Sequence, residues 1–233
     1  MKIVAIVQAR LDSTRLASKV LMDIHGKTML ERVYERASHG MRSFGANGKV
    51  VVATTWRSRD VPIVALCNRN HWPVFEGAVD DVLGRVYSCA AEHKADVVVR
   101  ITGDCPLLDP DVLEKAVTLF LGGDYHFVTN APSDVTGYPD GTDVEVFDFA
   151  TLAQANAFAR ASYQREHVTP WLHKAPATRT YYMAYSGPRC RPWKWSVDTQ
   201  GELDFVRSVY AGIGKHDFGM GDVVAWLSSQ TAR

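Results

Sequence analysis

The sequence predicts an α/β protein in which a mainly parallel, mixed sheet lies between two layers of helices. Three runs rich in Val and Ile, at residues 2–7, 49–54 and 96–102, indicate strands that are buried on both faces. Apolar residues at helical spacing occupy the stretches between and after them, at residues 28–42, 79–93 and 110–121. An alternation of strands and helices of this kind is typical of parallel strands joined by crossover helices. The first 122 residues therefore have the pattern of a doubly wound nucleotide-binding half.

The second half, residues 123–233, has a more mixed pattern. We expect strands at residues 125–129, 143–148, 180–185 and 193–197, and helices at residues 149–160, 164–175, 200–211 and 220–229. This part is predicted to be an extension that returns to the sheet, so that residues 1–233 form one domain. A core of this size is large enough to be stable without disulfides or a structural metal.

The amino-acid composition limits the kinds of molecule that the protein is expected to bind. Hydrophobic residues make up 46% of the 233 residues and charged residues 22%, which excludes a disordered chain and a coiled coil. Lys plus Arg and Asp plus Glu each number 26, whereas a nucleic-acid binder should be basic. No apolar run approaches the length of a membrane span. We expect a cytoplasmic protein that acts on small molecules, with reduced thiols at Cys67, Cys89, Cys105 and Cys190.

The loop after the first strand concentrates positive charge. Arg10, Arg15 and Lys19 lie within ten residues, together with the hydroxyls of Ser13 and Thr14. Because open α/β sheets bind ligands at the carboxyl ends of strands, these cations are placed to hold a triphosphate. A solvated basic loop is the alternative. The loop is neither a GxGxxG fingerprint nor a Walker A loop, which disfavours a Rossmann dehydrogenase and a P-loop kinase.

Two aspartates follow predicted strands and are candidate ligands of Mg²⁺. Asp104 comes after a buried strand and after Gly103, which permits close backbone approach. Asp198 follows the predicted strand 193–197. A local turn cap is the alternative role for Asp104. For Asp198 the alternative is a helix N-cap, unless Thr199 caps that helix and leaves Asp198 free.

Five motifs, in this order, carry a resemblance to a known family. They are VQARLDSTRLASKVL, RITGDCPLLDP, YPDGTDVEVF, REHVTPWL and WSVDT. The chain resembles the cytidylyltransferases that activate sugar acids as CMP conjugates, the acylneuraminate and 3-deoxy-manno-octulosonate enzymes, and above all their spore-coat polysaccharide branch. The resemblance extends from Ile3 to about Val209. The family usually has Pro-Gly where this chain has Ala17-Ser18, which predicts a softer loop and a shift of Lys19.

The resemblance implies the nucleotide-diphospho-sugar transferase fold and a site for CTP with Mg²⁺. By matching position, CTP would be held by Ala9, Arg10, Ser13, Arg15, Lys19 and Gly103, with Thr54, Gly77 and Asp80 as weaker candidates for the base. Asp104 and Asp198 would bind the metal, and Arg15 and Lys19 would stabilise the departing pyrophosphate. The extension would also form a homodimer.

The acceptor pocket is expected in matched segments of the second half, at Tyr138, Asp143, Glu145, Arg165, His167 and Trp195. Asp143 and Glu145 would share one strand face, where an acidic pair could bind sugar hydroxyls or line a solvent-exposed edge. Arg165 could pair with a substrate carboxylate or with a neighbouring acid. His167 is more often structural than a base. Trp193 and Trp195 are more typical of a core or a dimer contact than of a sugar platform.

Three functions remain open on these residues. The first is transfer of CMP from CTP to a sugar acid of the nonulosonate or 3-deoxy-ulosonate type, with release of pyrophosphate, for a surface polysaccharide. The second is the same reaction with an alditol phosphate or a phosphonate. That acceptor needs further cations in the second half, and Arg165, Arg179, Arg189 and Arg191 are candidates. The third is a catalytically weak binding subunit.

Overall fold

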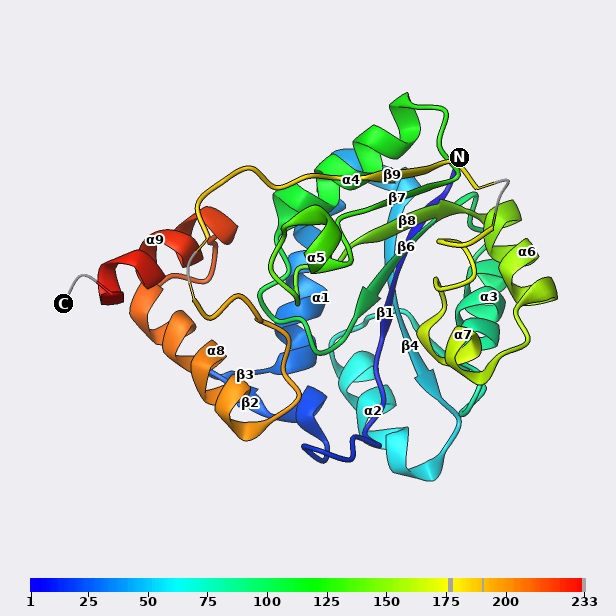
Figure 1. Cartoon of the computed structure of the whole chain (residues 1–233). Helices are drawn as coiled ribbons and strands as arrows, with labels where there is room; N and C mark the ends of the chain where they lie inside the picture. The colour runs from blue at the N-terminus through cyan, green and yellow to red at the C-terminus, as the bar shows by residue number, and fades with distance from the viewer. Residues whose placement is uncertain (176–177, 190, 232–233) are drawn as a thin grey trace.

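A seven-stranded sheet forms the middle of the molecule (Figure 1). The computed structural model describes residues 1–175, 178–189 and 191–231. The strand order is β5-β4-β1-β6-β8-β7-β9, and within this sheet β8 alone runs antiparallel to its neighbours. The strands are β1 (Ile3–Gln8), β4 (Gly48–Thr55), β5 (Val74–Gly77), β6 (Val97–Thr102), β7 (Phe127–Thr129), β8 (Glu145–Asp148) and β9 (Thr180–Tyr182). The mainly parallel, mixed sheet is confirmed.

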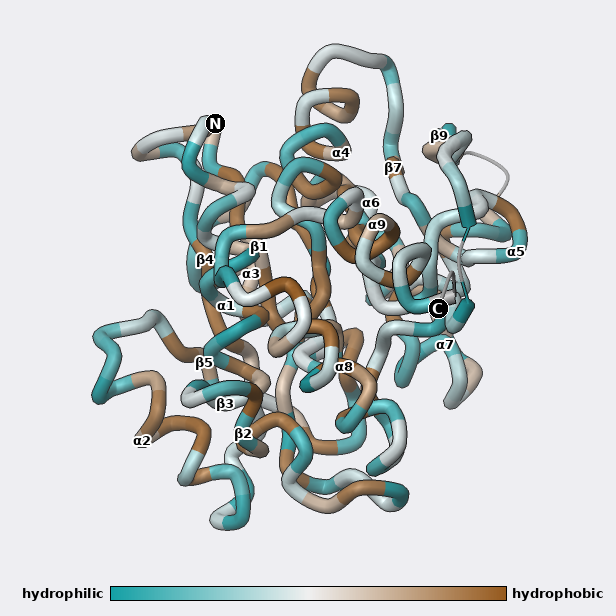
Figure 2. The backbone as a smooth tube through the Cα atoms, turned by 90° about the vertical axis from the view of Figure 1, so that its left-hand side faces the viewer, coloured by the Kyte–Doolittle hydropathy of each residue, from teal (hydrophilic) through white to brown (hydrophobic). Residues whose placement is uncertain are grey.

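Helices cover both faces of the sheet, because successive buried residues of its strands point to opposite sides. Ala5 and Val7 pack in one hydrophobic cluster, whereas Val4 and Ile6 pack in another. The first cluster is completed by α1 (Met29–Gly40), α2 (Val61–Arg69) and α4 (Pro110–Gly122). The second is completed by α3 (Val82–Glu92), α6 (Phe149–Phe158) and residues next to α7 (Ser162–His167). Figure 2 shows hydrophobic and hydrophilic stretches alternating along several of these helices.

A third hydrophobic cluster lies beside the sheet, where α8 (Gln200–Ile213) and α9 (Met220–Thr231) form one end of the molecule (Figure 1). These helices pack around Trp195, which is fully buried. Trp195 is therefore a core residue and not a sugar platform. The short strands β2 (Asp23–Ile24) and β3 (Lys27–Thr28) form a separate two-stranded sheet, whose Ile24 belongs to the same cluster.

Two expected elements are wrong in their extent. The expected strand 193–197 makes only an isolated bridge, because Lys194 meets Asp140 in a loop and not in a strand. The expected helix 164–175 already ends at His167, where Val168 has a φ of 70°. The structure also contains three elements that the sequence patterns did not predict, which are α2, β5 and the short helix α5 (Ser133–Thr136). Cys67, Cys89 and Cys105 are free and buried, and Cys190 lies outside the described residues. Among the described residues, no helix has the length and apolarity needed to cross a bilayer.

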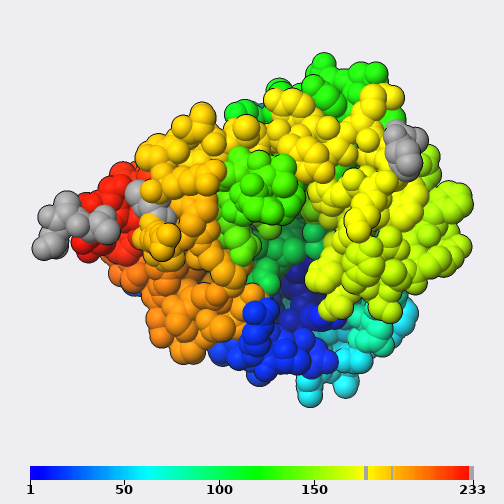
Figure 3. Space-filling model, in the orientation of Figure 1, coloured from blue at the N-terminus to red at the C-terminus, as the bar shows by residue number. Residues whose placement is uncertain are grey.

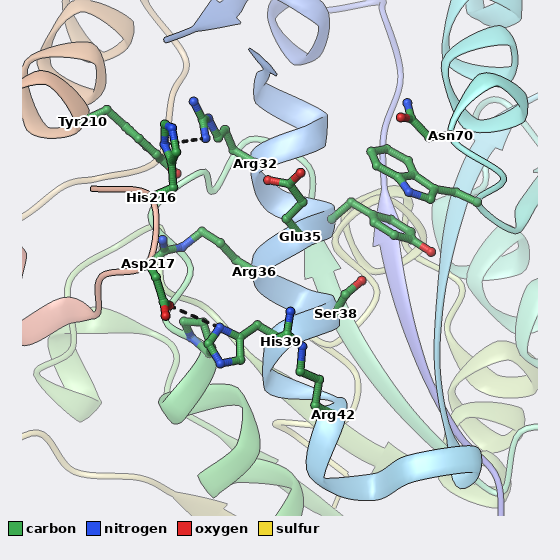
Figure 4. A pocket seen from close by; sticks show the side chains of 13 residues that line it. Arg32, Glu35, Arg36, Ser38, His39, Arg42, Asn70, Tyr210, His216 and Asp217 are labelled. Atoms are coloured by element: carbon green, nitrogen blue, oxygen red, sulfur yellow. Dashed lines mark hydrogen bonds and ion pairs between the residues drawn. The ribbon is translucent and has the colours of Figure 1, made fainter. Parts of the chain in front are cut away.

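Two buried arginines of α1 join the sheet layer to the third cluster (Figure 4). Arg32 donates to the carbonyl of Ile24 and meets Nδ1 of His216 at 3.0 Å. Arg36 donates to the carbonyls of Leu108 and Phe218. These groups line a hollow of about 550 Å³, but the guanidinium donors are directed at backbone carbonyls of three separate segments. Arg32 and Arg36 therefore act as a structural clamp, because their hydrogen bonds hold α9 and the loop before it against α1. The hollow is the space left outside these two side chains.

Replacing Arg36 with methionine should lower the free energy of unfolding by roughly 2 to 4 kcal/mol, because two buried carbonyls lose their donor. The Arg36 guanidinium also lies 4.4 Å from the centre of the Phe218 ring, and that contact disappears as well. Arg42→Met is the matched control, since Arg42 is exposed and lines the same hollow. Denaturant unfolding of both variants checks this. Equal stability of the two variants would contradict the clamp.

Candidate active site

A cleft of about 440 Å³ opens at the carboxyl ends of β1 and β6, which are paired side by side (Figure 3). The N-terminal loop after β1, the chain after β6, α7 and the segment before α8 surround it. Its lining includes nine residues that the sequence singled out: Ala9, Arg10, Ser13, Arg15, Lys19, Gly103, Asp104, His167 and Asp198. The structure thus brings the basic loop and both candidate metal ligands to one hollow.

The loop after β1 is held in place by a buried carboxylate. Asp60, 1% exposed, accepts a hydrogen bond from the Leu11 backbone N–H at 2.7 Å and another from the Thr55 hydroxyl. Further along, Ser18 adopts a left-handed conformation with φ 56°, and its N–H donates to the Leu11 carbonyl at 3.2 Å. A serine in this conformation is strained by about 1 to 2 kcal/mol relative to glycine. The loop closes nevertheless, and Lys19 follows at the start of a short 3-10 helix.

Lys19 is the centre of the site. Its Nζ donates to Asp104 Oδ2 at 2.7 Å, to Asp198 Oδ1 at 2.9 Å and to the Val197 carbonyl at 2.7 Å. Its side chain is 10% exposed. Burial acts to lower the pKa of Lys19, but Asp104 and then Asp198 outweigh it, so the pKa is raised and Lys19 stays protonated. The ammonium of Lys19 therefore reaches both aspartates with Ala17-Ser18 in place of the family's Pro-Gly.

Asp198 is surrounded by cations. Its Oδ1 lies 3.0 Å from Nη2 of Arg15, and its Oδ2 lies 3.2 Å from Nζ of Lys194. Burial alone would raise the pKa of Asp198, but Lys19 and Lys194 lower it overall. Thr199 caps α8 and forms a capping box with Glu202, so the carboxylate of Asp198 is free of that duty.

Asp104 does not have the alternative role of capping its own turn, because its carboxylate accepts a hydrogen bond from the Lys19 ammonium. Two carboxylates from distant parts of the chain therefore converge on one point, and only a cation there removes their repulsion. Oxygen donors of this kind fit Mg²⁺. The described residues contain no group of three or more His, Cys, Asp or Glu side chains arranged around a metal, so the remaining ligands would be phosphate oxygens and water.

Three residues suggested for the base lie outside the lining of this cleft. Thr54 is completely buried in β4, and its hydroxyl makes no hydrogen bond among the described residues. Gly77 ends β5, where a Cβ atom would come within 2.9 Å of Cγ of Arg85. Asp80 is exposed in a neighbouring hollow that also contains Trp56. Thr54 and Gly77 therefore serve packing, and Asp80 faces a different surface.

The residues suggested for the acceptor are spread over several environments. Tyr138 is 4% exposed and packs in the core. Glu145, also 4% exposed, is taken up by an ion pair with Arg100 and by a hydrogen bond of 2.6 Å from the Thr169 hydroxyl. Arg165 forms an ion pair with Asp81 outside the cleft lining. These three residues have structural partners, and His167 is the only one of the six expected acceptor residues found in the cleft lining of the described chain.

Asp143 differs from these residues because its environment raises the pKa of its carboxyl group. Burial, followed by the negative charges of Asp140 and Glu145, raises the pKa of Asp143 to about 7. Burial also raises the pKa of Asp140, and Asp104 and Asp198 add to the effect. Asp143 lies just before β8, and the expected alternation with Glu145 on one strand is thus only approximate. An acidic surface therefore adjoins the Lys19 site.

Sequence reasoning missed several residues that position the site. Asp60 and Lys194 were overlooked, although Lys194 and Glu202 both hold Asp198 through side-chain contacts. The signal for Glu202 is visible, because Thr199 followed by an acid three residues later is the signature of a capping box. Nothing in the sequence marks Lys194 or Asp60, since their roles arise from contacts between distant segments.

The arrangement defines the class of protein. A mainly parallel sheet presents a lysine, arginines and two converging carboxylates at its carboxyl edge, an arrangement that suits a nucleotidyltransferase. Residues 4–203 match the family model described as cytidylyltransferase, and the chain belongs to this family. It has the fold of a cytidylyltransferase from Leptospira borgpetersenii, with a TM-score of 0.88, 26% identity and coverage of 100% of this chain and 96% of that one. The nucleotide-diphospho-sugar transferase fold is thereby confirmed.

Three further proteins are similar to this chain in sequence. An uncharacterized protein of Methanocaldococcus jannaschii is 38% identical over 76% of this chain and 69% of its own length. Spore coat polysaccharide biosynthesis protein SpsF of Bacillus subtilis is 27% identical over 91% of this chain and 88% of its own. A 3-deoxy-manno-octulosonate cytidylyltransferase of Koribacter versatilis is 36% identical over 51% of this chain. This chain spans only 43% of that enzyme's length.

Proposed function

We propose that this protein transfers CMP from CTP to a sugar acid, with release of pyrophosphate, in the synthesis of a surface polysaccharide. The convergence of Arg15, Lys19, Asp104 and Asp198 on one cleft carries the proposal. The relatives named above support the acceptor class, because one makes a CMP-activated sugar acid by its name and another serves a polysaccharide.

The side chains of the cleft have separate tasks in this reaction. An acceptor oxygen attacks the α-phosphorus of CTP, and pyrophosphate leaves in line. Arg15 is 64% exposed at the mouth of the cleft, so it can fold over the β- and γ-phosphates. Lys19 carries a buried charge that is already oriented, and such a charge stabilises the departing pyrophosphate without reorganisation. The Asp60-anchored loop fixes the distance between these cations.

Asp104 and Asp198 would hold Mg²⁺. When bound, the ion would neutralise phosphate charge and stabilise the charge that develops in the transition state. The unequal surroundings of the two carboxylates fit this role. Lys19 and Lys194 keep Asp198 ionised, and Glu202 accepts a hydrogen bond from its backbone N–H, whereas the carboxylate of Asp104 contacts Lys19 and the thiol of its neighbour Cys105.

The environment of the acceptor favours a sugar acid over a phosphorylated acceptor. Asp140 lies near Asp104 and Asp198 and adds negative charge beside the Lys19 site, which repels a phosphate dianion more strongly than the single charge of a sugar carboxylate. Of the second-half cations that a phosphate would need, Arg165 and Arg179 are already in ion pairs with Asp81 and Asp124.

We also propose that residues 1–233 form one domain, that residues 123–233 form a homodimer contact, and that the protein is located in the cytoplasm.

Thermal unfolding with Mg²⁺ and each of CTP, UTP, GTP and ATP tests the donor. CTP at 100 times its dissociation constant should stabilise the fold by about 2.7 kcal/mol, a shift of several degrees at this size. Pyrophosphate release is then measured with CTP and a panel of sugar acids, alditol phosphates and phosphonates. Release with sugar acids alone is expected. A higher melting temperature with another nucleotide would identify that nucleotide as the donor in place of CTP. No change in melting temperature with any nucleotide would favour the alternative of a catalytically weak binding subunit.

A further inference from the structure

Arg85 presents an unusual buried cation at the cleft. It projects from the first turn of α3, is 2% exposed and lines the cleft with Arg10. Nη1 donates to the carbonyls of Ala78 at 2.7 Å and of Val79 at 3.5 Å. Within the described part of the chain, neither Nε nor Nη2 of Arg85 makes a hydrogen bond, and no carboxylate lies within 4.0 Å of its guanidinium. A fixed donor is thus left without an acceptor at the wall of the cleft.

This arrangement is costly in the protein without a ligand. A buried cation without a partner is destabilising, and leaving its donors unsatisfied adds to the cost. Burial, and next the positive charge of Arg10, lower the pKa of Arg85 to about 10, and the acids Asp60 and Asp81 only partly offset this. Arg10 is paired with Glu166 at 3.4 Å, whereas Arg85 has no carboxylate partner among the described residues, so an electron-rich group of a ligand would complete its surroundings.

The stem of Arg85 is held by close packing. A Cβ atom at Gly77 would lie 2.9 Å from Cγ of Arg85 and 2.7 Å from the Phe75 ring, so the glycine leaves room for the arginine. The guanidinium is therefore fixed below the turn between β5 and α3. Lys19, by contrast, is bound to Asp198 on the α8 side of the cleft. The two cations thus stand on different elements at separate walls of one cavity.

We propose that Arg85 recognises the pyrimidine base of the nucleotide, with Nη2 donating to the acceptor atoms O2 and N3 of cytosine. The inference rests on the proposed function, because it places the triphosphate against Lys19 and Arg15 and leaves the base at the β5–α3 end. Uracil carries a hydrogen on N3 and offers one acceptor fewer on that edge. Arg85 therefore acts as a specificity-determining residue that favours CTP over UTP.

The test compares Arg85→Lys with the wild-type protein in calorimetric titrations of CTP, UTP and inorganic tripolyphosphate with Mg²⁺. Loss of a charged hydrogen bond should weaken CTP binding by about tenfold to a hundredfold. The ratio of CTP to UTP affinity should fall toward one, while tripolyphosphate binding stays unchanged. Gly77→Ala provides a second variant, because it keeps the guanidinium but displaces its stem, and the same loss of discrimination is expected.

Each other result overturns a defined part of this interpretation. Parallel loss of tripolyphosphate and both nucleotides in Arg85→Lys would make Arg85 a phosphate ligand. An unchanged CTP-to-UTP ratio in both variants would assign it a purely structural role, whatever their stability. A wild-type protein that binds tripolyphosphate but no nucleotide would overturn the proposed function, and the base-recognition role would fall with it.

Discussion

Replacing Lys19 with methionine should lower turnover by about two to three orders of magnitude, the loss seen when one oriented charge at a reacting centre is removed. In this chain the loss has two physical sources. The departing pyrophosphate would lose its buried cation, and the carboxylates of Asp104 and Asp198 would face each other without the ammonium that both now contact at 2.7 and 2.9 Å. The pKa of Asp198 should rise, since Lys19 lowers it in the wild-type protein.

Pyrophosphate release and thermal unfolding measure the two effects separately. Lys27→Met is the matched control, because Lys27 also pairs with a carboxylate, that of Glu35, but on the surface. The control should keep its activity and lose less than about 1 kcal/mol. Turnover of Lys19→Met within a few-fold of wild type would refute the assignment of Lys19.

Asp198→Asn should lower turnover by about a thousandfold, because an amide is a poor substitute for the carboxylate that would hold Mg²⁺. The substitution should change stability little. Lys19 keeps its contacts with Asp104 and the Val197 carbonyl, and α8 keeps its cap at Thr199. Turnover that can be partly restored by raising the Mg²⁺ concentration would identify the defect as one of metal binding.

Asp204→Asn is the control for this variant. Asp204 lies on the same helix and forms a surface ion pair with Arg207 at 3.3 Å, so its loss should leave turnover unchanged. Titration of Mg²⁺ with a fixed concentration of CTP gives the measurement for both proteins. If Asp198→Asn and Asp204→Asn required the same Mg²⁺ concentration for half-maximal activity, the metal assignment would be wrong.

Much of the fold could be predicted because local patterns and tertiary environment agree. The runs of β-branched residues in β1, β4 and β6 are buried on both faces, and such runs rarely have another interpretation. The strand β5 was missed because it has only four residues, of which Gly77 alone is fully buried, and because the helix before it has a weak pattern. The strand predicted around Lys194 is wrong because the alternating tryptophans have the spacing of a strand, whereas the backbone there makes only an isolated bridge to a loop.

The nucleotide side of the candidate site was predictable in its composition, whereas the acceptor side was not. Arg15, Lys19 and Asp104 lie in the segments that follow β1 and β6, so the topology brings these segments to one edge. Glu145 and Arg165 also lie in motifs of the family, but their side chains are bound by Arg100 and Asp81. Which charged residue is committed to an internal partner depends on contacts across more than 40 positions, and no local pattern contains that information.

The contacts of Lys19 have a consequence for the order of events during synthesis. Its ammonium is held by Asp104 and by Val197 and Asp198, partners that lie 85 to 179 positions away along the chain. A growing polypeptide that has completed β1, β4 and β6 already possesses the basic loop, yet it lacks the acid that fixes its lysine. The nucleotide pocket therefore matures only after the segment leading into α8 has left the ribosome. The protein can therefore bind its substrate only when nearly the whole chain has been synthesised and has folded onto the sheet.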